Sequence, residues 1–300
     1  PTRRSSDLGV ILKKRNTEKQ KTAFLRAAQK QLEEAGFTVD ITCVAASIMK
    51  REAMHTYNLY AGDFNHAEIV FVTYYDTPLL QLFPRERKAF ASNWTQGNFL
   101  LHTLLFLLCI LVIVFLLYSG VLPNLQRYGF MSIWGAVLVL VCLSGFYIVR
   151  QMRGGMAAGN TMVRNSSSLI TLFALASELS EQEKEHVAFA LIDEGTRSEY
   201  GLKMLDAYLN GKSIKRVYLD AIGNTGRLQC FSRDEISISA DMEWHEKRKA
   251  MDPYGDILLT RGEFQNSAVI LRDDKNDQAI EHIMSTADAL HELIRQCFDV

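Results

Sequence analysis

Two apolar segments of twenty residues each, at positions 99–118 and 130–149, interrupt the middle of this 300-residue chain. Neither segment contains Asp, Glu, Lys or Arg. A helix rises about 1.5 Å per residue, so twenty residues can cross the hydrocarbon core of a bilayer, which is about 30 Å thick. The pattern therefore predicts a two-helix transmembrane hairpin. The alternative is a buried pair of helices in a large soluble fold.

Basic residues flank the outer ends of this hairpin. Three precede the first segment and two follow the second: Arg85, Arg87, Lys88, Arg150 and Arg153. The connection at 119–129 carries only Arg127, and its Gly120 and Pro123 suit a turn. Because basic residues are enriched on the cytoplasmic side, we predict an integral membrane protein with two spans and a cytoplasmic soluble domain.

Composition excludes several classes of function. The net charge of −1 argues against a nucleic-acid-binding protein. The five cysteines are scattered without a CxxC pair, so neither a disulfide framework nor a cysteine zinc site is indicated. The first eight residues, PTRRSSDL, resemble a translated adapter sequence, and we leave 1–8 out of the fold reasoning.

Outside the hairpin, apolar runs typical of buried strands alternate with helical patterns. The expected strands are 37–44, 67–74, 186–192, 217–222, 227–231 and 268–271, and the expected helices are 17–36, 166–179, 197–209 and 277–298. This order predicts a three-layer α/β fold: a largely parallel sheet with helices on both faces. One domain would comprise 9–96 and 150–300, with the hairpin inserted at 97–149.

Chemistry in such sheets lies at the carboxyl ends of the strands. Several ordered stretches near these ends resemble the co-catalytic zinc aminopeptidase family, which also includes glutaminyl cyclases and the transferrin-receptor ectodomain. They are RNTEKQKTAF, GDFNHAEIVFVTYYDTP, NSSSLITLFALASEL, VAFALIDE and VYLDAIGN. The chain is most similar to bacterial membrane-bound members that carry a transmembrane insertion after the first metal-site strand.

The resemblance implies a site for two zinc ions, held by His, Asp, Glu and His, with a Glu as general base. The first His of the pattern falls on Tyr74 in this sequence, while the Asp that would orient it is kept as Asp76. The bridging Asp falls on Arg164, and the Asp ligand after the next strand is kept as Asp220.

The remaining positions of the pattern have also changed. The paired Glu residues fall on Gly195 and Thr196, with Glu194 one residue away, and the last His falls on Arg272. One retained ligand cannot hold even a single catalytic zinc ion, which needs about three protein ligands. The resemblance therefore implies a degenerate metal site without a cofactor.

The introduced arginines suggest how the old carboxylates are compensated. Our hypothesis is that Arg164 and Arg272 pair with Asp220 and Asp76, because buried carboxylates need a counter-charge. The alternative is that the arginines point to solvent and the site has collapsed.

Two functions follow from this reading. The first is a catalytically inactive, membrane-anchored peptidase-like protein, which binds the lipid bilayer and acts as a scaffold or binding module for an active paralogue or a peptide ligand. The second is an active zinc-dependent exopeptidase at the cytoplasmic membrane face. It would use Asp76, Asp193, Glu194 and Asp220, with His245 or His186 completing the site.

Overall fold

The computed structural model describes residues 14–48, 52–78, 80, 87–90, 96–152, 162–195, 198–271 and 277–298. Residues 1–8, Thr196 and Arg272 lie outside this range. The chain divides into an α/β unit (Pro1–Pro78, Arg85–Asn93 and Ala158–Val300) and a helical unit (Leu79–Pro84 and Trp94–Ala157). Each unit is described by itself.

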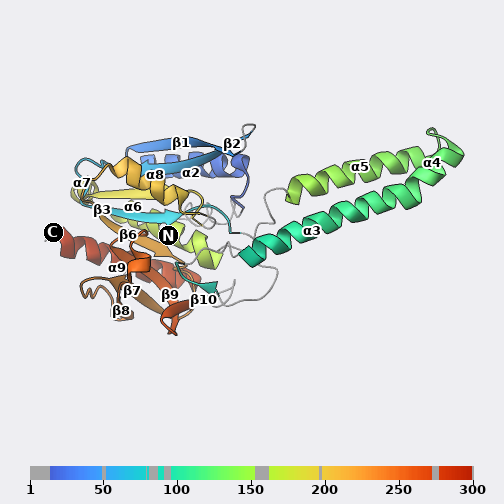
Figure 1. Cartoon of the computed structure of the whole chain (residues 1–300). Coiled ribbons are helices and arrows are strands. Elements are labelled where there is room, and N and C mark those ends of the chain that lie inside the picture. Colours follow the sequence, from blue (N-terminus) through green and yellow to red (C-terminus); the bar gives the residue numbers. More distant parts are fainter. Residues whose placement is uncertain are drawn as a thin grey trace. The chain divides into compact units, whose positions relative to one another are not determined.

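A ten-stranded sheet forms the centre of the α/β unit (Figure 1). Its strands are β1 (Val39–Ile48), β2 (Glu52–Ala61), β3 (Ile69–Tyr74), β4 (Arg87–Lys88), β5 (Val187–Ile192), β6 (Lys215–Asp220), β7 (Arg227–Ser232), β8 (Met242–Glu246), β9 (Ile257–Gln265) and β10 (Ala268–Leu271). Their order is β1-β2-β5-β3-β6-β9-β10-β4, and β7 pairs with both β8 and β9.

The sheet is mixed, which corrects the expected largely parallel arrangement. Only β5, β3, β6 and β9 form a continuous parallel core, while β1, β2, β10 and β4 pair antiparallel at the two sides. Short connections join the antiparallel pairs β1–β2 and β9–β10, whereas β2–β5 and β10–β4 pair strands that are far apart in the sequence. The β9–β10 turn has positive φ at both Asn266 and Ser267, the backbone of a tight two-residue hairpin.

Helices cover both faces of the sheet, so the expected three layers are confirmed. Those of the α/β unit are α2 (Glu18–Glu34), α6 (Ser167–Glu178), α7 (Glu181–His186), α8 (Tyr200–Leu209) and α9 (Ala279–Phe298). Apolar residues of α2, α6 and α9 pack in one core with one face of the sheet. Leu202, Leu205 and Leu209 of α8 pack in a second core on the other face.

The start of α2 is fixed by a capping box. The Thr17 hydroxyl accepts from the Gln20 backbone N–H at 3.4 Å, and the Gln20 side chain accepts from the Thr17 N–H at 3.2 Å. Such caps satisfy backbone donors that a helix leaves free in its first turn. On the helix that begins here, Lys21 lies on the buried side with Phe24 and Ala28.

The helical unit contains two apolar helices, α3 and α5 (Figure 1). α3 (Gln96–Phe115) continues through a π-helical turn (Leu116–Val121) into α4 (Leu122–Tyr128), and α5 spans Ile133–Met152. In the described part of the chain, one helix, Leu100–Tyr128, is long and apolar enough to cross a membrane, and only 6% of its most apolar stretch is buried. The apolar part of α5, Ile133–Val149, falls short of the 18 residues taken here as the minimum length of a membrane-spanning helix.

The turn of the hairpin lies later than the sequence indicated. Residues 119–128 are helical, and the chain turns at Gly129, where φ is 77°. Pro123 is tolerated because it lies in the first turn of α4. The Asn124 side chain donates to the Gly120 carbonyl at 2.7 Å, which satisfies one acceptor in the π-helical turn.

Candidate functional site

Three parallel strands of the sheet core end at one edge and deliver polar side chains there. Tyr74 and Ile192 are register partners at the ends of β3 and β5, and β6 ends in Asp220. Tyr75 and Asp76 follow β3, while Asp193 and Glu194 follow β5. The side chains form two groups. The Lys21 group comprises Arg15, Lys21, Asp76, Asp193 and Glu194, and the Asp220 group comprises Tyr74, Arg164, Asp220 and the Phe90 backbone.

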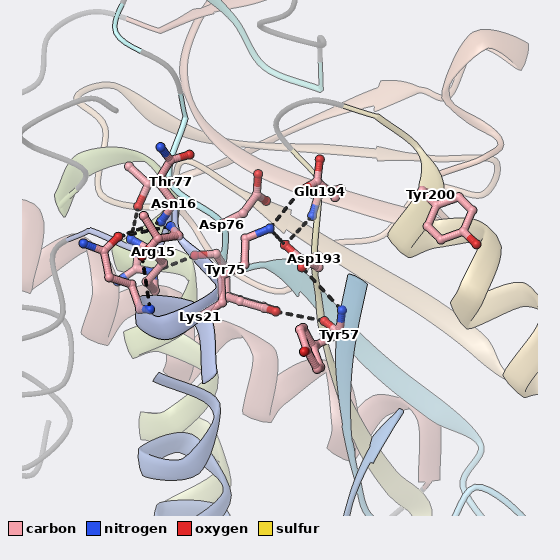
Figure 2. Close-up of polar contacts among 12 residues, drawn as sticks. Arg15, Asn16, Lys21, Tyr57, Tyr75, Asp76, Thr77, Asp193, Glu194 and Tyr200 are labelled. Carbon is pink, nitrogen blue, oxygen red and sulfur yellow. Dashed lines mark hydrogen bonds and ion pairs between the residues drawn. The ribbon is translucent and has the colours of Figure 1, made fainter. Parts of the chain in front are cut away.

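Lys21 binds two carboxylates at once. Its Nζ lies 2.7 Å from Asp193 Oδ1 and 2.8 Å from Glu194 Oε1 (Figure 2). The exposed fractions of the three side chains are 7%, 0% and 4%. An ion pair buried away from water is stable only if short, well-aligned contacts compensate for the hydration that both charges lose. The short contacts of Lys21 meet that condition.

Arg15 is the second cation of this group and is fully buried. Its backbone N–H donates to Thr77 Oγ1 at 2.6 Å, its Nε donates to the Tyr75 carbonyl at 2.5 Å, and its terminal nitrogen donates to Ser166 Oγ at 3.0 Å. Burial lowers the pKa of Arg15 to about 10, and the negative charge of Asp76 opposes this shift. Arg15 therefore links the segment before α2 to the residues that follow β3 and to Ser166, which precedes α6.

The carboxylates of the Lys21 group outnumber its cations. Burial raises the pKa of Asp193 to about 6, and the charges of Asp76 and Glu194 add to the rise while Lys21 opposes it. Burial lowers the pKa of Lys21, but the charges of Asp193 and Glu194 more than reverse this, so its pKa is raised. Lys21 is therefore a permanent cation, while Asp193 gains a proton in mildly acidic solution.

The Asp220 group is a chain of three hydrogen-bonded side chains. Arg164 Nε donates to the Tyr74 hydroxyl at 3.0 Å, and this hydroxyl donates to Asp220 Oδ1 at 2.7 Å. The Phe90 N–H donates to Asp220 Oδ2 at 2.9 Å. Burial raises the pKa of Tyr74 well above its usual value, so the hydroxyl keeps its proton and remains a donor. Both oxygens of the buried Asp220 are thereby satisfied.

The hypothesis of direct arginine–aspartate pairing needs correction. Among the residues that the structure describes, Arg164 reaches Asp220 only through the Tyr74 hydroxyl, because the tyrosine side chain lies between them. Within the described part of the chain, Arg15 and Lys21 are cations whose charges act on Asp76. The part assigned to Arg272 stays a prediction, since that residue is outside the described range.

Gly195, where the resemblance implied a Glu, lies directly against Tyr74. A Cβ added at Gly195 would lie 2.2 Å from Tyr74 Cβ and 2.7 Å from its Cγ. These distances are far below van der Waals contact. Position 195 therefore accepts only glycine in this backbone arrangement, because the nearest atom is Tyr74 Cβ, which any residue except glycine would place there. The preceding residue, Glu194, has a left-handed backbone with φ of 57°, and such strained positions are frequent at functional sites.

Neither histidine of the second function completes the site. His186 precedes β5, at the amino end of that strand, with its Nδ1 3.0 Å from Glu68. The site lies at the carboxyl end of the same six-residue strand, roughly 20 Å away at about 3.3 Å per residue. His245 contacts Gln229 at 2.6 Å and stacks on the Phe264 ring.

Sequence reasoning missed Arg15 and Lys21. A signal for Lys21 was present, because it precedes Phe24 by three residues and Ala28 by seven and thus falls on the apolar stripe of its helix. A charged residue on such a stripe calls for a buried partner. Arg15 lies before the helix, where no periodic pattern marks it.

The side chains at these strand ends do not fit a zinc ion. The described residues contain no group of three or more His, Cys, Asp or Glu placed to hold a metal. Asp193 and Glu194 already bind an ammonium, and Asp220 accepts from a phenol and an amide. A catalytic zinc site needs about three ligands directed at one point.

Comparison with known structures identifies the fold. A Zn-dependent exopeptidase from Parabacteroides distasonis matches with a TM-score of 0.53 at 7% identity, covering 97% of this chain and 96% of the other. A leucine aminopeptidase precursor from Bacteroides thetaiotaomicron gives 0.52 at 10% identity, with 97% and 96% covered. A Porphyromonas gingivalis glutaminyl cyclase gives 0.52 at 7% identity, with 98% and 97% covered. No protein-family model matches the sequence, and a search of curated proteins found no match.

The Tyr74 hydroxyl can be tested by removing it alone. Tyr74→Phe leaves the Arg164 Nε donor and one Asp220 oxygen buried without their partner, so we expect it to lower the free energy of unfolding by about 1–3 kcal/mol. Denaturant titration of the full chain in detergent measures this. Tyr218→Phe is the matched control, because the structure describes no hydrogen bond of that buried hydroxyl; an equal loss in both variants would contradict the role of Tyr74.

The raised pKa of Asp193 predicts a dependence of stability on pH. The folded state holds the proton up to about pH 6, whereas the unfolded state releases it near pH 4, so this contribution to stability falls as pH rises between these values. We expect the difference in unfolding free energy between wild type and Asp193→Asn to decline by up to about 3 kcal/mol from pH 4 to pH 7. Leu191→Val, a nearby uncharged change, serves as control. A difference that is flat or rises for Asp193→Asn would contradict the assignment.

Proposed function

We propose that this protein is a membrane-anchored, peptidase-like protein that acts as a binding or scaffold module without zinc hydrolysis. The Lys21 ammonium between Asp193 and Glu194 carries the proposal, because a covalently attached cation already neutralises carboxylates at the strand ends. The Asp220 group supports it, since an arginine and a tyrosine saturate the remaining carboxylate. Hydrolysis would require ligands and a general base that are free to reach metal and substrate.

The ligand of this module would be a peptide or an active paralogue of the same fold. Proteins of one fold can have different functions, because function depends on the residues of the site. The structurally similar peptidases and cyclases therefore do not assign an activity to this chain. The second function, a zinc-dependent exopeptidase, would need the carboxylates of the Lys21 group to exchange their ammonium for metal.

Membrane attachment would run through the helical unit. Its apolar side chains are widely exposed, including Leu111, Phe115 and Leu140, each more than 60% accessible. Exposed apolar surface of this extent is costly in water and suits a lipid environment. We propose that α3 and α5 both cross the bilayer, since about 17 apolar residues are the lower limit for a span, with the α/β unit in the cytoplasm.

Zinc content tests the loss of hydrolytic function. We expect the detergent-purified chain, equilibrated with zinc and then dialysed, to contain no stoichiometric zinc, and to release p-nitroaniline from leucyl-p-nitroanilide no faster than buffer. Asp220→Asn is the matched variant, because it keeps the size and an acceptor oxygen of the side chain. One or two zinc ions per chain that are lost in Asp220→Asn, together with p-nitroaniline release above buffer, would instead establish the exopeptidase.

Thiol labelling tests the two spans and their direction. Gln126 lies exposed near the turn of the hairpin, and Cys43 lies exposed on β1 of the α/β unit. In intact cells, a membrane-impermeant maleimide is expected to label Gln126→Cys, whereas Cys43 reacts only after permeabilisation. Cys43→Ser removes the second signal and serves as its control. Labelling of Cys43 in intact cells would reverse the orientation, and extraction of the chain by alkaline carbonate would refute membrane insertion.

A further inference from the structure

We infer that segment 87–90, which comprises β4 and the two residues after it, is a tethered ligand that covers a peptide-docking surface of the α/β unit. Release of the segment would expose this surface to an extended peptide with an aromatic side chain at the place of Phe90. The inference rests on the proposed function and deepens it, because it names the surface of the binding module and the kind of peptide that fits there.

The backbone of segment 87–90 attaches to the sheet as an added strand. β4 pairs antiparallel with β10 over two residues, and the Ala89 N–H donates to the Val269 carbonyl at 3.0 Å. Because β4 is the last strand in the order of the sheet, β10 would become an edge without it. A free sheet edge can bind an extended peptide through main-chain hydrogen bonds. The segment therefore takes the position that such a peptide would take.

The Phe90 ring packs among three aromatic rings that belong to other elements. Its centroid lies 6.3 Å from that of Tyr218, 5.9 Å from that of Phe231 and 6.1 Å from that of Tyr254. These rings come from β6, from β7 and from the turn before β9. Aromatic pairs at such distances are favourable beyond the area that they bury. The three rings would therefore select an aromatic side chain in a peptide.

A third contact joins the segment to Asp220. The Phe90 N–H donates to Asp220 Oδ2 at 2.9 Å, and Asp220 is only 2% exposed. Hydrogen bonds to a carboxylate are stronger than those between neutral groups. A peptide that replaced the segment could donate its own backbone N–H to this oxygen. The docking surface therefore comprises the edge of β10, the three rings and Asp220 Oδ2.

The attachment of segment 87–90 is weak at its end. Phe90 has a φ of 54°, in the left-handed region, where a bulky residue is an outlier. Such a backbone persists only while surrounding contacts hold it. A two-residue strand that ends in a strained residue has few contacts with the sheet, so we expect it to open more readily than the central strands. Loss of the Phe90 ring would then release the segment.

Peptide binding by two release variants tests the inference in the full chain in detergent. Phe90→Ala removes the ring but keeps a strained residue, and Ala89→Pro removes the N–H that donates to Val269 without changing the docking surface. The probe is acetyl-Arg-Lys-Ala-Phe-amide, which repeats the sequence of residues 87–90. In isothermal titration calorimetry, we expect each release variant to bind the probe at least about tenfold more tightly than wild type, because a site that is open in few chains has a reduced apparent affinity.

A control variant and a control peptide make the result specific. Lys88→Ala changes an exposed side chain in the same segment and should bind the probe as weakly as wild type does. Acetyl-Arg-Lys-Ala-Ala-amide has the charge of the probe but no ring, and each release variant should bind it at least about tenfold more weakly than the probe. A folded release variant that gains no affinity, or that binds both peptides equally, overturns the inference.

The wild type decides the question if neither release variant folds. At about 5 mM, the probe should raise the thermal midpoint of wild type more than the control peptide does, because binding to the folded state stabilises it. Equal shifts overturn the inference. The proposed function is tested separately in the same samples with leucyl-p-nitroanilide. Release of p-nitroaniline above buffer contradicts that function whether or not the probe binds, whereas a failure of peptide binding alone removes only the docking surface.

Discussion

The ion pairs of Lys21 with Asp193 and Glu194 join α2 to the ends of the central strands. Buried carboxylates of this kind carry a desolvation penalty of several kcal/mol each, so they require a counter-charge in close contact. The capping box at Thr17 fixes where α2 begins, and Lys21 lies on the buried side of this helix. Arg15, just before the cap, makes a second attachment to the same strand ends. The docking of α2 and the electrostatics of the site therefore depend on one another.

The two groups of the site neutralise their carboxylates in different ways. The Lys21 group uses direct ion pairs, whereas Asp220 is stabilised by a phenol that a buried arginine polarises. The residues that contact Tyr74 and Asp220 from outside the strands, Arg164 and Phe90, lie on either side of the apolar hairpin in the sequence. The Asp220 group is therefore contacted both by the segment that precedes the apolar hairpin and by the segment that follows it.

Much of this arrangement could be predicted from residue patterns, and the remainder could not for physical reasons. Buried parallel strands such as β3 and β5 are continuous apolar runs, so both were found within two residues of their bounds. β2 was missed because its face toward α2 is mixed in polarity, and the sheet is consequently less parallel than expected. The polar strand ends were located correctly. Their partners were not, because Arg15 and Lys21 are distant in sequence and only tertiary packing brings them to the site.

The contact of Gly195 with Tyr74 has a consequence for what the strand ends can accept. A Cβ at position 195 would lie 2.2 Å from Tyr74 Cβ, an atom that every residue except glycine has. No substitution at 74 other than glycine would therefore make room for a side chain at 195. The backbones after β3 and β5 are committed to this close approach, so any change of chemistry at position 195 must begin with a movement of the main chain.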